Sequence, residues 1–217
     1  MFQSKAYIER RHGKNSANRS EYLEQLINEY KTTKDKGICL LCVQNINDLQ
    51  FMYVVAKQQV LAHLANFAYD PINYDHLWNL YAVDLFLEAI TDPDPLLREF
   101  GMGGLANICL EPRHYEYIMS QPSFRQNIIS CLDNTWTKNI KVNAMTTLML
   151  LITEENYSGN KKKRILGIII FFFFLLMLII VLLTDELKNR LLNIKNNDKD
   201  KQTTMLASLF LADYYHC

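Results

Sequence analysis

Apolar residues recur at helical rather than strand spacing along most of this 217-residue chain. A first stripe lies on one side of a predicted helix and consists of Val60, Leu61, Leu64, Phe67 and Ala68. Pro71 cannot continue that helix, and a second stripe runs from Leu77 to Ile90 before the D-P-D-P turn at residues 92–95. Because the chain has only 7 Gly and 5 Pro, little interrupts this periodicity. The pattern predicts an all-α fold.

Two stretches of the chain match each other at a fixed offset of 41 residues. Residues 64–77 read LANFAYDPINYDHL, and residues 105–118 read LANICLEPRHYEYI. The identical positions are Leu64, Ala65, Asn66, Pro71 and Tyr74, which recur as Leu105, Ala106, Asn107, Pro112 and Tyr115. In an all-α chain, a period near 40 predicts units of two or three helices that stack into a solenoid.

Several short sequence motifs in and around these repeats resemble those of a known family. LANFAYDP, VDLFLEAI, EFGMGGLANIC, EYI and AMTTLM are similar, in order and spacing, to those of the small armadillo repeat-containing protein seven family. The resemblance covers residues 57–151 and, more loosely, residues 22–36. It implies an armadillo-type α-solenoid of about three repeats with capping helices. The third repeat starts at Val142 and departs from the pattern, because Leu150 stands where the earlier repeats have Asn.

Two insertions interrupt the predicted solenoid. The first, residues 37–55, has no counterpart in the family and is β-prone or ambiguous. The expected organisation is a disordered basic N-terminus at 1–19, a capping helix at 20–36, the first insertion at 37–55, armadillo repeats at 56–151, an apolar insertion at 158–183 and C-terminal helices at 184–217. We expect residues 193–202 to form a solvated loop between the last two helices.

The apolar insertion contains an uncharged run that begins at Ile165, ends at Leu183 and follows the sequence KKKR. As a helix it would be about 28 Å long, which suits a single membrane span with the basic residues on the cytoplasmic side. The genetic code favours another origin, because every residue of the run except Gly167 has codons with a central T. A translated pyrimidine-rich tract from a retained intron would read in this way. A buried core helix is the third alternative, although a helix that is apolar on every face suits a small solenoid poorly.

The resemblance also implies which residues meet a partner. In armadillo proteins, an Asn on the third helix of a repeat faces the concave groove, and its amide bonds to the backbone of an extended peptide. Asn66 and Asn107 match this position. Alternatively, they satisfy a helix end or a turn between repeats. Tyr74, Tyr115 and Trp78 complete the predicted partner-binding set, although a repeated packing contact also explains the two tyrosines.

The implied role is that of a protein-binding adaptor in the nucleus. By resemblance, its partner is an RNA-recognition-motif protein of the minor spliceosome, and contact with nucleic acid is only indirect. The charge balance agrees with an indirect role, because 23 Lys and Arg face 23 Asp and Glu. A single-pass membrane-anchored armadillo scaffold is the alternative, if residues 165–183 span a membrane.

The sequence offers little support for catalysis. Cys39 and Cys42 form a lone CxxC without a second pair, and the odd number of cysteines, 5, indicates a reducing compartment rather than a disulfide framework. The glycines between Gly101 and Gly104 lie inside a predicted helix, where small residues permit close packing more readily than they bind a nucleotide. We expect no catalytic residues, no metal and no cofactor.

Overall fold

The structure is a computed structural model that describes residues 19–32, 46–152 and 182–216. Within these ranges the chain forms helices and the turns between them, without a strand, so the all-α prediction is confirmed. The helices are armadillo-like in their order of short and long elements. The chain divides into two compact units at the bond between Ile108 and Cys109, and each unit is described by itself.

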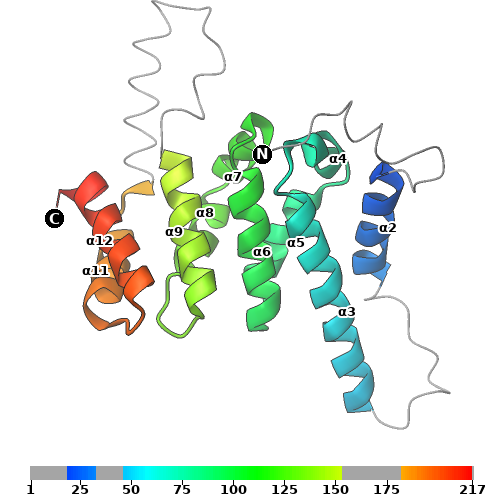
Figure 1. Ribbon diagram of the computed structural model, residues 1–217, viewed down its shortest axis with the longest axis horizontal. Helices are drawn as coiled ribbons and strands as arrows, with labels where there is room; N and C mark the ends of the chain where they lie inside the picture. The colour runs from blue at the N-terminus through cyan, green and yellow to red at the C-terminus, as the bar shows by residue number, and fades with distance from the viewer. Residues whose placement is uncertain (1–18, 33–45, 153–181, 217) are drawn as a thin grey trace, which may run out of the picture. The chain divides into compact units, whose positions relative to one another are not determined.

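Along the sequence of the first unit, two long helices, α3 and α6, are separated by a set of short ones. Its elements are α2 (Arg19–Thr32), α3 (Ile46–Phe67), the 3₁₀ turn η1 (Pro71–Asn73), α4 (Tyr74–Asn79), α5 (Ala82–Ala89) and α6 (Pro95–Ile108). The long helices α3 and α6 lie side by side, α2 packs on α3, and α5 packs on α6 (Figure 1). Fully buried side chains from these helices form the core, among them Leu23, Leu61, Leu64, Phe86 and Leu105.

The first insertion differs in part from its prediction. Residues 37–55 were expected to be β-prone or ambiguous, but α3 begins at Ile46 and continues without a break into the repeat. No Gly or Pro interrupts residues 46–67, so nothing in the chain opposes helix continuation there. Strand propensity depends on a partner strand, and among the described residues none is present.

Two glycines of α6 permit its close approach to α5. A Cβ atom at Gly101 would lie 2.9 Å from the Cβ of Ala89, and one at Gly104 would overlap the ring of the fully buried Phe86. These distances are shorter than van der Waals contact. The prediction that this glycine segment serves helix packing is therefore confirmed.

The second unit repeats the alternation of short and long helices. Its elements are α7 (Pro112–Ser120), α8 (Pro122–Ser130), α9 (Lys138–Ile152), α11 (Asp185–Asn197) and α12 (Lys201–Tyr215). Helices α11 and α12 form an antiparallel hairpin, and α12 also packs on α9 (Figure 1). The predicted solvated loop at 193–202 is wrong, because helix continues to Asn197 and resumes at Lys201. The three residues between these helices form a capped turn.

Several predictions fall outside the described residues. These include the expected disorder of the N-terminus, the CxxC pair and all of the apolar run except its last two residues. Among the described helices, none has both the length and the apolar character needed to cross a membrane. The domain boundaries proposed from the sequence remain a prediction.

Candidate protein-binding face

The side chain of Asn107 links the ends of the two long helices of the first unit. Asn107 lies in the last turn of α6, and its Nδ2 donates a hydrogen bond of 3.0 Å to the carbonyl oxygen of Ala65 in the last turn of α3. Asn66 is the next residue on α3 and is exposed. The two asparagines of the repeat are thus neighbours at the same end of the helix pair. Their side chains differ in hydrogen bonding. Asn107 donates to a carbonyl at the end of a helix, whereas Asn66 forms no side-chain hydrogen bond with another described residue.

Asn107 is also held through its backbone. The hydroxyl group of Tyr74, at the start of α4, donates a hydrogen bond of 3.0 Å to the Asn107 carbonyl oxygen. A carboxamide has two N–H donors and an oxygen that accepts two hydrogen bonds, so the bond to Ala65 uses only a part of its capacity. The remaining donor and the oxygen of the half-buried Asn107 amide are oriented before any partner arrives.

Helical spacing places other accessible side chains in line with the asparagines. On α3 the exposed positions are Gln59, His63 and Asn66, and on α6 the half-buried positions are Phe100, Gly103 and Asn107. We call these six residues the amide face. The face combines the amides of Gln59, Asn66 and Asn107 with the His63 imidazole, the Phe100 ring and a glycine, and it carries no Lys, Arg, Asp or Glu. Such a surface suits an uncharged peptide backbone better than a charged ligand.

The other predicted partner-binding residues make contacts inside the fold. Tyr115 is 5% exposed, and its hydroxyl group donates a 3.3 Å hydrogen bond to the Leu151 carbonyl oxygen. Tyr74 makes the corresponding bond to Asn107. These bonds are the repeated packing contact that the sequence allowed as an alternative. Trp78 is half-buried near the end of α4. A role of Tyr74, Tyr115 or Trp78 toward a partner stays a prediction.

An acidic residue caps the first short helix that follows each of α3 and α6. Asp70 accepts a hydrogen bond of 3.3 Å from the backbone N–H of Ile72, and its carboxylate lies 3.6 Å from the guanidinium group of Arg19 on α2. Arg19 also donates to the side chain of the buried Asn73, which in turn donates to the Phe67 carbonyl oxygen at 2.7 Å. This cluster fixes the direction in which the chain leaves α3.

The corresponding cap in the second unit is Glu111. It accepts a hydrogen bond of 3.0 Å from the backbone N–H of His114 and pairs with the Arg113 guanidinium group at 2.6 Å. Partial burial alone would raise the pKa of Glu111, but the bonds from Arg113 and His114 lower it below its usual value. The His114 ring is fully buried, with Nδ1 3.0 Å from Glu111, and this burial lowers the pKa of His114.

Sequence reasoning missed a repeated Asp-x-Asp turn that precedes a long helix in both units. In each turn the first Asp accepts the backbone N–H of the second, at 2.8 Å for Asp92 and 2.9 Å for Asp198. The second Asp caps the helix, with Asp94 accepting from two N–H groups of α6 and Asp200 from two of α12. The spacing D-x-D before each helix was the available signal. The prediction of a turn at 92–95 is confirmed.

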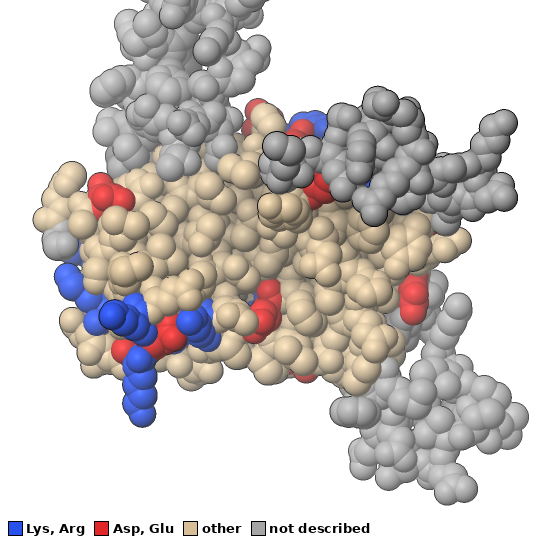
Figure 2. All heavy atoms as spheres, viewed as in Figure 1, with Lys and Arg blue, Asp and Glu red and all other residues tan. Residues whose placement is uncertain are grey.

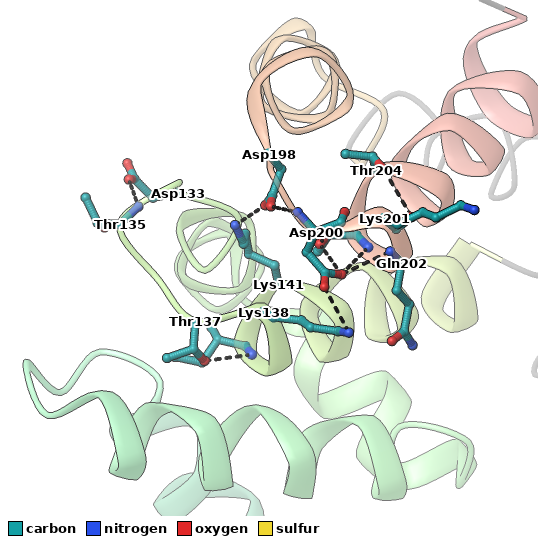
Figure 3. A network of polar contacts seen from close by, with 12 residues as sticks. Asp133, Thr135, Thr137, Lys138, Lys141, Asp198, Asp200, Lys201, Gln202 and Thr204 are labelled. Carbon is teal, nitrogen blue, oxygen red and sulfur yellow. Dashed lines mark hydrogen bonds and ion pairs between the residues drawn. The ribbon is translucent and has the colours of Figure 1, made fainter.

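The two turns are anchored by different side chains. Gln58 of α3 donates hydrogen bonds of 3.0 and 3.1 Å to Asp94. In the second unit, Lys138 of α9 lies 3.1 Å from Asp200, and the buried Lys141 forms an ion pair with Asp198 (Figure 3). Hydrogen bonds from the Thr203 backbone and from Lys138 lower the pKa of Asp200 to about 2. Nothing in the sequence pattern identified these lysines.

The described residues show no arrangement for metal chemistry. Across residues 19–32, 46–152 and 182–216, no group of three or more His, Cys, Asp or Glu side chains could hold a metal ion. Cys109 and Cys131 are buried and form no disulfide, and burial raises the pKa of the Cys109 thiol to about 12. A thiol in this state is a poor nucleophile at neutral pH.

Comparison with known proteins supports the armadillo-like interpretation over a part of the chain. The chain is 38% identical over 84 residues to the mouse (Mus musculus) armadillo repeat-containing protein 7. The match covers 39% of this chain and 33% of the mouse protein, so it spans about a third of that relative's length. No protein-family model matches the chain. Over this part, the chain therefore resembles an armadillo-repeat protein.

Proposed function

We propose that the chain is a non-enzymatic adaptor that binds an extended segment of a protein partner across the amide face. The observation that carries the proposal is the pair of asparagines at the ends of α3 and α6. The Asn107 amide is oriented by Ala65 and retains bonding capacity, and Asn66 beside it is exposed. Each amide can offer both a donor and an acceptor to one peptide unit of the partner.

The composition of the amide face supports an extended ligand. An extended strand exposes backbone N–H and C=O groups along its length, and side-chain amides are suited to pair with them. The small Gly103 between Phe100 and Asn107 leaves space for a main chain to approach α6. Phe100 offers an apolar contact next to these polar groups.

The partner we propose is an RNA-recognition-motif protein of the minor spliceosome, with the nucleus as the site of action. This step rests on the resemblance to the armadillo repeat-containing protein seven family. The net charge of zero supports an assignment in which the partner, rather than this chain, contacts RNA. The proposal assigns no catalytic step to the chain.

The decisive test is the affinity of the purified chain for an RNA-recognition-motif protein of the minor spliceosome, measured by titration calorimetry. Asn66→Ala removes an exposed amide that makes no side-chain bond within the described fold, so its effect reports on binding. One lost hydrogen bond weakens affinity by about threefold to tenfold, and the double variant with Asn107→Ala by more. Asn79→Ala is the matched control, because it removes an exposed amide of α4.

The same measurement can reject the proposal. Unchanged affinity of the Asn66→Ala, Asn107→Ala double variant would exclude the amide face as the binding surface. Asn107→Ala also loses the bond to Ala65, so its thermal unfolding must be compared with that of Asn66→Ala. Weaker binding by both single variants, with the unfolding temperature of Asn66→Ala unchanged, supports the proposal.

A further inference from the structure

The outer side of α12 exposes apolar side chains in a row. Met205 is 68% exposed and Leu209 is 49% exposed, whereas Ala207, Phe210 and Leu211 of the same helix are buried. Positions three or four residues apart are neighbours on the surface of a helix. The exposed residues Lys201, Met205, Leu209 and Ala212 therefore form one stripe, which we call the α12 stripe.

Positive charge gathers at the N-terminal end of this stripe. Lys195, Lys199 and Lys201 are exposed at the turn between α11 and α12. The two carboxylates of that turn are already engaged, Asp198 by Lys141 and Asp200 by Lys138. Figure 3 shows the Lys201 side chain extending away from these ion pairs. Figure 2 shows basic side chains gathered around acidic ones at the lower left, with uncharged surface beside them.

The apolar row and the lysines together specify the chemistry of an occupant. We propose that the α12 stripe, with Lys195 and Lys199, docks an amphipathic helical segment of a protein partner. The segment carries apolar residues one helical turn apart, which cover Met205 and Leu209. It carries Asp or Glu at the end that meets the lysines, since opposite charges fix the orientation and speed the encounter.

Other occupants fit these observations less well. A nucleic acid would contact the lysines but would leave Met205 and Leu209 uncovered. A second copy of the chain would bring only one exposed carboxylate of the stripe's far end, Asp213, to three lysines. The stripe lies in the second unit and shares no residue with the amide face.

A designed peptide provides a direct test on the full-length chain. The probe is a fluorescent helical peptide of about 16 residues with Leu at positions i, i+4 and i+7 and three Glu at one end. Fluorescence anisotropy measures its affinity. We expect the Met205→Gln, Leu209→Gln variant to bind about tenfold more weakly, because two apolar contacts are lost. We expect Lys199→Gln, Lys201→Gln to bind severalfold more weakly at low salt and to show a smaller salt dependence.

Matched controls make each outcome decisive. Leu96→Gln changes a side chain that is 46% exposed in the first unit, and Asn66→Ala changes the amide face, so both should bind the probe as the natural chain does. Equal binding of a scrambled peptide, or equal binding by the Met205→Gln, Leu209→Gln variant, would overturn the proposal. Light scattering that shows a dimer lost in this variant would also overturn it, in favour of a second copy. Circular dichroism confirms that each variant is folded.

Discussion

The two units contain the same types of stabilising contact, but different side chains make some of these contacts. In each unit an acidic residue caps a short helix, a tyrosine hydroxyl donates to a carbonyl in the last turn of the next long helix, and an Asp-x-Asp turn caps the final helix. The two tyrosine bonds join residues 33 and 36 positions apart, Tyr74 with Asn107 and Tyr115 with Leu151. They hold the helices in place, which is why they recur.

The two units differ in the side chains that bind the Asp-x-Asp turn and in the residues that they expose to solvent. The first unit anchors its Asp-x-Asp turn through the neutral Gln58, and the second through Lys138 and the buried Lys141. At the exposed face, the first unit has Asn107, whereas Leu150 occupies the aligned position in α9. The Asp-x-Asp turn is thus anchored by a neutral amide in the first unit and by lysines in the second. The amide face belongs to the first unit alone.

The largest expected effect is the loss of the buried ion pair in the second unit. The Lys141 and Asp198 side chains are 7% and 9% exposed, so Lys141→Met leaves a buried carboxylate without its counterion. We expect the free energy of unfolding to fall by about 3 kcal/mol. Urea titration that follows Trp136 fluorescence in a Trp78→Phe background reports on the second unit, because the chain has 2 tryptophans, one in each unit.

Two companion variants sharpen this prediction. Gln58→Ala removes the neutral anchor of the first unit and should lower its stability by about 1 kcal/mol. Adding Asp198→Asn to Lys141→Met should restore a part of the loss, because it removes the buried charge. Equal losses from Lys141→Met and Gln58→Ala would show that the buried charge does not distinguish the units.

Close packing in the first unit gives the next largest effect. A methyl group at Gly104 would overlap the buried Phe86 ring, so Gly104→Ala should lower the free energy of unfolding by about 1–3 kcal/mol despite the better helix propensity of Ala. The aligned residue of α9 is the buried Thr147, which shows that the second unit accommodates a larger side chain there. Gly103→Ala, at a half-buried position, should be neutral or stabilising. Urea titration with Trp78 fluorescence as the probe compares the two variants. An unchanged free energy of unfolding in Gly104→Ala would contradict the close approach of α5 and α6.

The sequence predicted what depends on local pattern and missed what depends on distant pairing. The periodicity and the 41-residue repeat gave the helices around Pro71 and Pro112 and the close packing at Gly104. The pattern could not show that Lys141 meets Asp198, because the two residues are 57 positions apart and are brought together only by the α9 and α12 packing. For the same reason 193–202 looked like a solvated loop, although Asp198 is nearly buried. The repeat identified Asn107 but not its bond to Ala65, which depends on how closely α3 and α6 pack.

The two tyrosines give a smaller effect that tests whether the shared contact is equally important. Tyr115→Phe removes a hydroxyl from a buried site and leaves the Leu151 carbonyl oxygen without this donor, so we expect a loss of about 1–2 kcal/mol. Tyr74 is half-buried, and water can replace its hydroxyl at Asn107, so Tyr74→Phe should lose about half as much. Thermal unfolding of both variants measures the difference. A larger loss for Tyr74→Phe would show that the bond to Asn107 is the more important of the two.

The smallest expected effect is a pH dependence confined to the second unit. Burial lowers the pKa of His114, so the unfolded chain takes up a proton at a higher pH than the folded chain does. The stability of the second unit should therefore fall as the pH drops below about 6.5, the ordinary value for His. The equivalent residue in the first unit is Asn73, which does not titrate. Urea titrations between pH 8 and 5, followed by Trp136 fluorescence, should show this decrease in the free energy of unfolding. The His114→Asn variant should lack the decrease. The control variant His216→Asn changes an exposed histidine and should keep it. If the decrease survives in His114→Asn, another group causes it, and the buried histidine does not distinguish the two units.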